Sequence, residues 1–101
     1  MNHKILICDD QENTRESVKS ILGDRYDLFL VDSPEQALYT LENSKNIKAV
    51  LLNTHMSQSS SQDLIDQIKN KHKTILVAGY VKPLKKQEIL ETVRKCVEPA
   101  L

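Results

Sequence analysis

Four short apolar runs alternate with four amphipathic segments along this chain, and the alternation restricts the folds open to it. The runs cover residues 5–8, 28–31, 49–52 and 74–78 and are rich in Ile, Leu and Val. Continuous apolar runs of this length are typical of strands buried on both faces of a parallel sheet. Parallel strands need crossover connections of about a dozen residues, which are usually helices. We therefore expect an α/β fold built on a parallel sheet.

The amphipathic segments carry start and stop signals for helices. Asn13 and Glu16 have the spacing of a capping box and Gly23 is a typical stop, which together predict the first helix. Ser33 followed by Pro34 predicts the start of the second helix. The serine run at 57–61 predicts the start of the third.

The last helix is expected to begin with Pro83 at its first position and to end at Pro99. No repeat or linker divides the sequence, and 101 residues is the length of a single domain. We therefore expect one domain over residues 1–101.

Composition excludes several classes of protein. Charged residues make up 28% of the chain, and no apolar stretch approaches the roughly 20 residues that a membrane helix needs, so we expect no membrane association. The start of the chain has no signal-peptide pattern, which favours a cytoplasmic location. Cys8 and Cys96 lie far apart without a metal-type spacing, and we expect both to be reduced thiols.

The charges balance overall but are unevenly distributed. Residues 1–44 hold four Lys or Arg against nine Asp or Glu, and residues 45–101 hold ten against five. The halves therefore carry net charges of minus five and plus five. The basic half lacks interleaved aromatic residues and a glycine-rich basic segment, so we expect no nucleic-acid partner.

Polar side chains follow three of the predicted strands. Asp9 and Asp10 end the first strand, Asn53 ends the third, and Lys82 follows the fourth. Ligands of parallel α/β sheets bind at the carboxyl ends of the strands. Two carboxylates, an amide and an ammonium are therefore expected to meet in one crevice.

Three motifs at these strand ends resemble the receiver domain of bacterial two-component response regulators. Residues 4–10 (KILICDD) match the first strand and acidic pair of that family, residues 53–57 (NTHMS) its Asp-any-any-Met-Pro signature, and residues 80–84 (YVKPL) its Lys-Pro corner. The resemblance covers almost the whole chain and implies a flavodoxin-like sheet of order 2-1-3-4-5.

The resemblance also implies roles for the crevice residues. In the family the acidic pair, here Asp9 and Asp10, holds a magnesium ion, and the lysine, here Lys82, contacts a phosphoryl group. The family's phosphoacceptor aspartate is replaced by Asn53, whose neutral carboxamide is a poor nucleophile. We therefore expect no phosphorylation and no cofactor beyond weakly bound magnesium.

Other positions also depart from the family pattern. Ala78 stands where receivers carry a Thr or Ser that binds the phosphoryl oxygen, and Ser57 replaces the proline of the signature. Tyr80 lies one residue closer to the lysine than the aromatic residue that receivers use as a switch. Ala78 and Tyr80 are therefore interpreted as degenerate switch positions.

One family helix is absent. Only Gly79 separates Ala78 from Tyr80, where receivers have a fourth helix and its loops. Two neighbouring parallel strands cannot be joined so briefly. We therefore expect four strands in the order 2-1-3-4 and four helices, with residues 80–82 either extending the fourth strand or linking it to the last helix. Exchange of the carboxyl-terminal segment between two chains is the alternative.

These departures favour a non-enzymatic protein interaction module of a signalling system, with the sheet face left bare by the missing helix as a homodimer contact. Two other hypotheses stay open: a neighbouring acid such as Asp9 or Asp10 accepts phosphate, or the crevice binds a small ligand or metal. The simpler interpretations are that the acids solvate a strand end, that Asn53 is a turn residue, and that Lys82 forms a structural ion contact with Asp9 or Asp10.

Overall fold

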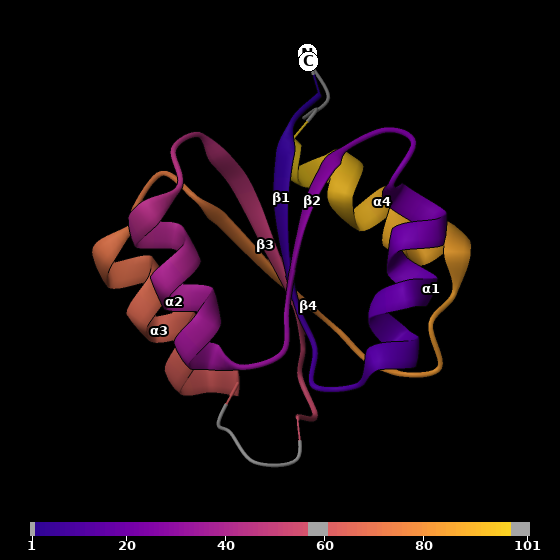
Figure 1. Ribbon diagram of the computed structural model, residues 1–101, viewed down its shortest axis with the longest axis horizontal. Helices are drawn as coiled ribbons and strands as arrows, with labels where there is room; N and C mark the ends of the chain where they lie inside the picture. The colour runs from indigo at the N-terminus through magenta and orange to yellow at the C-terminus, as the bar shows by residue number, and fades with distance from the viewer. Residues whose placement is uncertain (1, 57–60, 98–101) are drawn as a thin grey trace.

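The chain folds into alternating strands and helices around one sheet (Figure 1). The computed structural model describes residues 2–56 and 61–97, so the predictions made for Ser57 and Pro99 lie outside the described residues. The elements in chain order are β1 (Lys4–Cys8), α1 (Glu12–Leu22), β2 (Asp27–Val31), α2 (Pro34–Asn43), β3 (Ile47–Asn53), α3 (Ser61–Lys71), β4 (Leu76–Tyr80) and α4 (Lys86–Val97).

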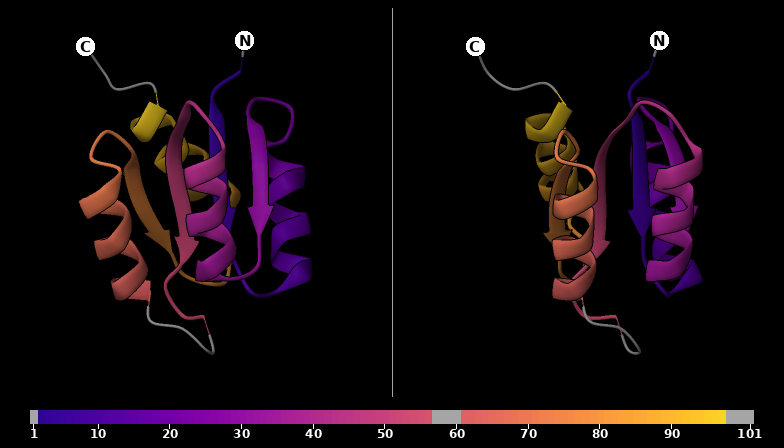
Figure 2. Two further views of the ribbon diagram at one scale, coloured as in Figure 1. Left: turned by 60° about the vertical axis from the view of Figure 1, so that its left-hand side comes forward. Right: turned by 90° about the vertical axis from the view of Figure 1, so that its left-hand side faces the viewer.

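The sheet has four parallel strands in the order β2-β1-β3-β4, as predicted. The first two strands of the sequence, β1 and β2, therefore form one half of the sheet, and β3 and β4 form the other half (Figure 2). β1 and β3 are central, and their side chains are almost completely buried because helices cover both faces. β2 and β4 are the edge strands.

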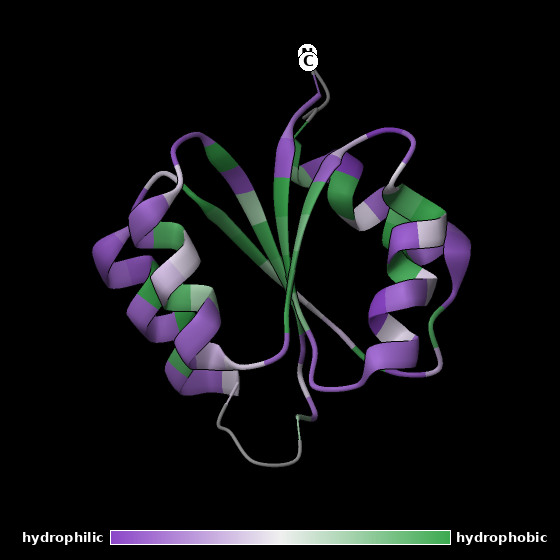
Figure 3. Cartoon of the chain, in the orientation of Figure 1, coloured by the Kyte–Doolittle hydropathy of each residue, from purple (hydrophilic) through white to green (hydrophobic). Residues whose placement is uncertain are grey.

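Two helices cover each face of the sheet. One apolar core lies under α2 and α3, and the other lies under α1 and α4 (Figure 1). The strands of the sheet are mostly hydrophobic, and the sides of the helices that face away from the sheet are largely hydrophilic, as Figure 3 shows. No helix in the described parts of the chain is long and apolar enough to cross a bilayer.

The first two helices test the predicted start signals. α1 begins at Glu12, with Gln11 as an N-cap that makes no side-chain capping bond, so the predicted start at Asn13 is wrong. The cause lies upstream, because the Gln11 N–H already donates to Asp9 Oδ1 at 2.9 Å and the chain enters the helix from there. For α2 the prediction is confirmed: Ser33 Oγ accepts a hydrogen bond from the Gln36 N–H at 3.2 Å.

The route from β4 to α4 combines the two alternatives left open by the sequence, since Tyr80 extends the strand and the residues after it form a connection. β4 covers residues 76–80 rather than 74–78, because the Tyr80 carbonyl still accepts from the Thr54 N–H at 3.0 Å beside β3. Residues 81–85 then connect the strand to α4, which begins at Lys86, so Pro83 does not open that helix. The Lys82–Pro83 peptide is cis.

The carboxyl-terminal helix packs on its own chain. Ile89, Val93 and Val97 of α4 are buried in the core that also contains Ile5 and Ile7 of β1. This single chain therefore buries its own α4, and exchange of the carboxyl-terminal segment is not needed to complete the core.

Candidate functional site

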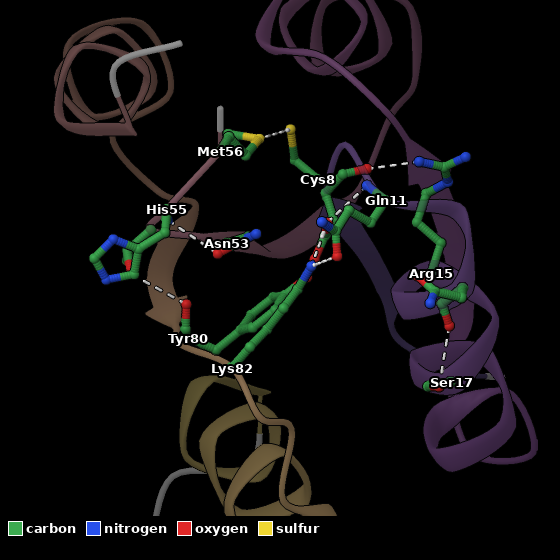
Figure 4. Close-up of polar contacts among 12 residues, drawn as sticks. Cys8, Gln11, Arg15, Ser17, Asn53, His55, Met56, Tyr80 and Lys82 are labelled. Atoms are coloured by element: carbon green, nitrogen blue, oxygen red, sulfur yellow. Dashed lines mark hydrogen bonds and ion pairs between the residues drawn. The ribbon is translucent and has the colours of Figure 1, made fainter. Parts of the chain in front are cut away.

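The carboxyl ends of β1, β3 and β4 bring the predicted crevice residues together. Figure 4 shows Tyr80 and Lys82 pointing from the β4 side toward the end of β1, where Cys8 and Gln11 lie. Asp9 follows β1, Asn53 is the last residue of β3, and Tyr80 is the last of β4. We call the group Asp9, Asn53, Tyr80 and Lys82 the acid pocket.

Asp9 is the centre of the acid pocket. Its side chain is completely buried, and a buried carboxylate is tolerated only when its oxygens are paired. Oδ1 accepts the Gln11 N–H at 2.9 Å and lies 3.5 Å from Lys82 Nζ, and Oδ2 accepts the Tyr80 hydroxyl at 2.6 Å. The predicted structural ion contact between Lys82 and Asp9 is confirmed.

The Lys82 ammonium has a second partner. Its Nζ donates to the side-chain oxygen of Gln11, the residue that caps α1. The Arg15 guanidinium of α1 donates to the Asp9 backbone carbonyl at 2.7 Å. The start of α1 therefore supplies polar partners on both sides of the buried aspartate.

Tyr80 was not expected to contact the acidic pair. Burial and its hydrogen bond to Asp9 raise the pKa of the Tyr80 hydroxyl above its ordinary value, so the hydroxyl remains a donor. The predicted strand ended at Ala78, which hid the fact that Tyr80 is directly opposite Asn53 in the β3–β4 ladder. One signal in the sequence could have revealed this contact. Ala78 and Tyr80 are two residues apart, so in an extended strand their side chains share one face, and a side chain predicted at the crevice for residue 78 implies the same face for residue 80.

Ala78 lies deeper in the sheet than predicted. It is paired with Leu51, two positions before the end of β4, and Tyr80 occupies the strand end instead. The Ala78 methyl group offers no hydroxyl to the pocket. The side chain that β4 presents to Asp9 is therefore that of Tyr80.

Asn53 is buried, with 2% of its surface exposed. Its side-chain oxygen accepts the His55 N–H at 2.9 Å, and its backbone carbonyl accepts the Ser61 hydroxyl at 3.1 Å. The first of these bonds is a local asparagine turn of the kind that stabilises loops after strands. Asn53 therefore holds the start of the β3–α3 loop, and its carboxamide lacks the lone-pair reactivity of a carboxylate.

The donor set does not fit a receiver-type magnesium site. Magnesium needs several oxygen ligands in near-octahedral geometry, and here both Asp9 oxygens already accept hydrogen bonds while an ammonium lies beside one of them. Asp10 is partly buried next to Asp9, and Asn53 contributes a neutral amide. Residues 2–56 and 61–97 contain no cluster of three His, Cys, Asp or Glu side chains suited to a metal.

Thr54 and Gly79 hold the end of β4 against β3. The Thr54 N–H and hydroxyl both donate to the Tyr80 carbonyl, at 3.0 and 3.2 Å. A Cβ on Gly79 would clash with the Thr54 Cγ2 atom, so the close approach of the two strands favours glycine there. These contacts set the position from which Tyr80 reaches Asp9.

A cavity of about 270 Å³ lies beside the acid pocket, between β4 and α4. Its lining includes Thr54, Tyr80, Leu84, Glu88 and Ile89. It contains neither Asp9 nor Asn53, so it is a neighbouring hollow rather than the predicted crevice.

Comparison with known proteins gives a fold but no close sequence relative. No family model and no curated protein matches the sequence. Among solved structures, the signal receiver domain of an HD domain-containing protein from Pseudomonas fluorescens Pf-5 has a TM-score of 0.83 and 21% identity, covering 97% of this chain and 96% of that one.

Two further structures are similar over nearly the whole chain. A response regulator receiver protein from Pseudomonas putida is 24% identical with a TM-score of 0.80, and the match covers 94% of this chain and 98% of that one. The response regulator TrrA from Thermotoga maritima, solved in complex with Mg²⁺ and BeF, is 24% identical with a TM-score of 0.84 and coverage of 96% and 100%. The chain therefore has the flavodoxin-like fold found in response regulator receiver domains.

Proposed function

We propose that this chain is a receiver-type domain of two-component signal transduction that works without phosphorylation, as a cytoplasmic, non-enzymatic protein interaction module. The observation that supports this most strongly is the state of Asp9. Its buried carboxylate is paired with Tyr80, Lys82 and the Gln11 N–H, all groups of the chain itself. Lys82, the lysine that the resemblance assigns to a phosphoryl group, instead pairs with Asp9 and donates to Gln11.

The second support is the chemistry of Asn53. Phosphoryl transfer to a receiver needs an oxygen nucleophile in line with the phosphorus atom and a cation that neutralises the developing charge. The Asn53 oxygen is neutral and accepts the His55 N–H. In this proposal the contacts of the acid pocket hold β1, β4 and the start of α1 together. The protein surface around them then stays in one conformation, which a protein partner can bind.

A phosphodonor experiment tests the proposal. The protein is incubated with acetyl phosphate and magnesium and then analysed by intact mass, and we expect no added phosphoryl group. The matched variant is Asn53→Asp, which restores a carboxylate of nearly the same size, and Asn53→Asp with Tyr80→Phe also frees one Asp9 oxygen. We expect phosphorylation to increase in that order, and stoichiometric labelling of the unaltered chain would refute the proposal.

The alternative that a neighbouring acid accepts phosphate predicts a different pattern. Labelling would occur in the unaltered chain and would disappear in Asp10→Asn, whereas loss in Asp9→Asn alone would be ambiguous because that carboxylate is buried and paired. The full pairing of Asp9 argues against its attack on phosphorus. We therefore rank this alternative below the non-phosphorylated module.

Binding of a small ligand is the remaining alternative, and the cavity between β4 and α4 is the observation in its favour. Titration with magnesium, manganese and nucleotides, followed by amide shifts, separates the possibilities. Shifts at Asp9, Asp10 and Asn53 would place a ligand in the acid pocket, and shifts at Leu84 and Ile89 would place it in the cavity. A titration without shifts removes both.

Self-association through the surface near β4 is part of the proposal. Leu76 and Val81 are 50% and 56% exposed, which is high for large hydrophobic side chains. The predicted bare sheet face is not found, because two helices cover each face, so the exposed residues at the β4 edge are the candidate contact instead. Solution mass measured over a range of protein concentrations tests this point.

A further inference from the structure

The sheet order converts the uneven charge along the sequence into a polarity in space. α1 contacts β2, and α3 and α4 contact β4, so the acidic first half of the chain lies toward the β2 edge and the basic second half toward the β4 edge (Figure 2). The net charges are minus five for residues 1–44 and plus five for residues 45–101. The two open edges of the sheet therefore have opposite electrostatic character.

Neither edge strand is protected by its sequence. Soluble proteins usually block open edges with lysine, proline or bulges, because an unpaired strand edge can pair with another chain. β4 has the sequence Leu-Val-Ala-Gly-Tyr, and β2 has Asp-Leu-Phe-Leu-Val, with a single charge at its first position. Leu28, Phe29 and Leu30 of β2 are only partly buried. Beyond Asp27, each edge thus presents a strand without charged residues.

We propose that the β4 edge of one copy docks alongside the β2 edge of a second copy, so that the parallel sheet continues from chain to chain. At the amino ends of the strands this places Lys73, before β4, near Asp24 and Asp27 at the start of β2. All three are exposed. Like charges at this end are Arg25, before β2, and Lys4 and Lys19, which lie beside Asp27.

The carboxyl ends match in the same way. Exposed Lys85 and Lys86 follow β4, and exposed Asp32 and Glu35 follow β2. Pairing β4 with β4 would instead bring lysines together, and pairing β2 with β2 would bring carboxylates together. Complementary charge therefore favours the head-to-tail arrangement over either symmetric one.

The helix layers permit the sheet to continue. Four strands spaced by about 4.8 Å occupy roughly 19 Å, and two helices side by side on a face occupy roughly 20 Å. With two helices on each face, adjacent copies can meet edge to edge without a gap in either layer. A head-to-tail contact of this kind leaves one free edge at each end of the assembly. It therefore produces a series of oligomers of increasing size rather than a dimer alone.

The proposal concerns how the interaction module binds copies of itself, and it does not depend on whether Asn53 accepts phosphate. The full chain is examined by sedimentation velocity over a wide concentration range, at about 0.05 M and about 0.5 M salt. We expect masses that grow with concentration beyond a dimer, and an apparent Kd that rises about tenfold or more at the higher salt. A monomer at every concentration would overturn the proposal.

Amide exchange identifies the surface involved. On association, amides of residues 27–31 and 76–80 should become more protected, since the new contact pairs these two strands. A dimer that stops growing and leaves those amides unchanged would mean that a helix face mediates the contact, and the edge proposal would be wrong.

Charge reversal provides a heterotypic test. Lys73→Glu with Lys85→Glu makes the β4 edge acidic, and Asp27→Lys with Asp32→Lys makes the β2 edge basic. Neither double variant should associate alone, but an equimolar mixture should. Lys69→Glu with Lys95→Glu, which changes the net charge equally on exposed helix positions, is the control and should weaken association much less than the edge reversals do. A mixture that remains monomeric while the variants stay folded would contradict the proposal.

Discussion

Asp9 and Tyr80 are 71 positions apart in the sequence, and their contact is the central polar interaction of the molecule. A buried carboxylate without partners is strongly unfavourable, so each donor around Asp9 contributes to stability. Tyr80 provides a short bond that leaves its hydroxyl protonated, and Lys82 provides the opposite charge. Asp9, Tyr80 and Lys82 thus take part in holding the fold together.

Removal of the tyrosine hydroxyl measures this contribution. We expect Tyr80→Phe to lower the free energy of unfolding by about 2 kcal/mol, because Asp9 Oδ2 loses a hydrogen bond to a charged acceptor in a buried site. Urea denaturation gives the value. Tyr39→Phe is the control, since Tyr39 is 69% exposed and should change stability little. Equal effects of the two substitutions would show that the Asp9 contact is not stabilising.

Cys8 provides a pH-dependent prediction. Burial, with the neighbouring Asp9 charge adding to it, raises the pKa of its thiol from 9.0 to about 12. Above about pH 9 the unfolded chain releases this proton while the folded chain keeps it, so the free energy of unfolding falls as pH rises, by about 1 kcal/mol per unit. Urea denaturation between about pH 8 and pH 10 should show a shallower slope for Cys8→Ala. Identical slopes would contradict the assignment.

At the scale of elements, the close contact between β3 and β4 determines where the acid pocket forms. Thr54 donates twice to the Tyr80 carbonyl, and Gly79 leaves room for the Thr54 methyl group. This contact extends β4 to Tyr80, which is one of the two alternatives that the sequence left open. It therefore carries the Tyr80 side chain to the sheet edge where Asp9 lies.

Gly79→Ala tests the strand contact. The added methyl group would clash with Thr54 Cγ2, and we expect a loss of about 1–2 kcal/mol in the free energy of unfolding. Thr54→Ser removes that methyl group but keeps the hydroxyl, so the double variant should recover much of the loss. A thermodynamic cycle from urea denaturation gives the coupling. If the two losses simply add, the proposed clash is wrong.

At the scale of the whole molecule, one central sheet joins the two cores. Leu6, Val50 and Leu52 face α2 and α3, while Ile5 and Leu51 face α1 and α4. Alternate residues of the same strands thus stabilise opposite layers. Both cores therefore depend on β1 and β3, and the edge strands contribute less.

Substitution of two leucines compares how much the centre and the edge of the sheet contribute to the free energy of unfolding. Leu51 is fully buried, and Leu51→Ala should lower the free energy of unfolding by about 3 kcal/mol. Leu76 is 50% exposed at the edge, and Leu76→Ala should cost about 1 kcal/mol or less. Thermal and urea unfolding at low protein concentration give both values. Similar losses would mean that β4 is packed more tightly than its exposure indicates.

The fold class, the four strands with their order and the capping of α2 at Ser33 could be predicted from the sequence, because periodicity, capping residues and crossover length act locally or through topology. The sequence also offered a structural ion contact of Lys82 with Asp9 or Asp10, and the fold selects Asp9. The predicted N-cap of α1, the start of β4 and the start of α4 were wrong, since long-range contacts override local signals there, and the sequence leaves the end of β4 open between two routes. The hydrogen bond from Tyr80 to Asp9 could not be predicted from the sequence. That contact depends on the register of β4 against β3, which hydrogen bonds between distant segments set and no local pattern encodes.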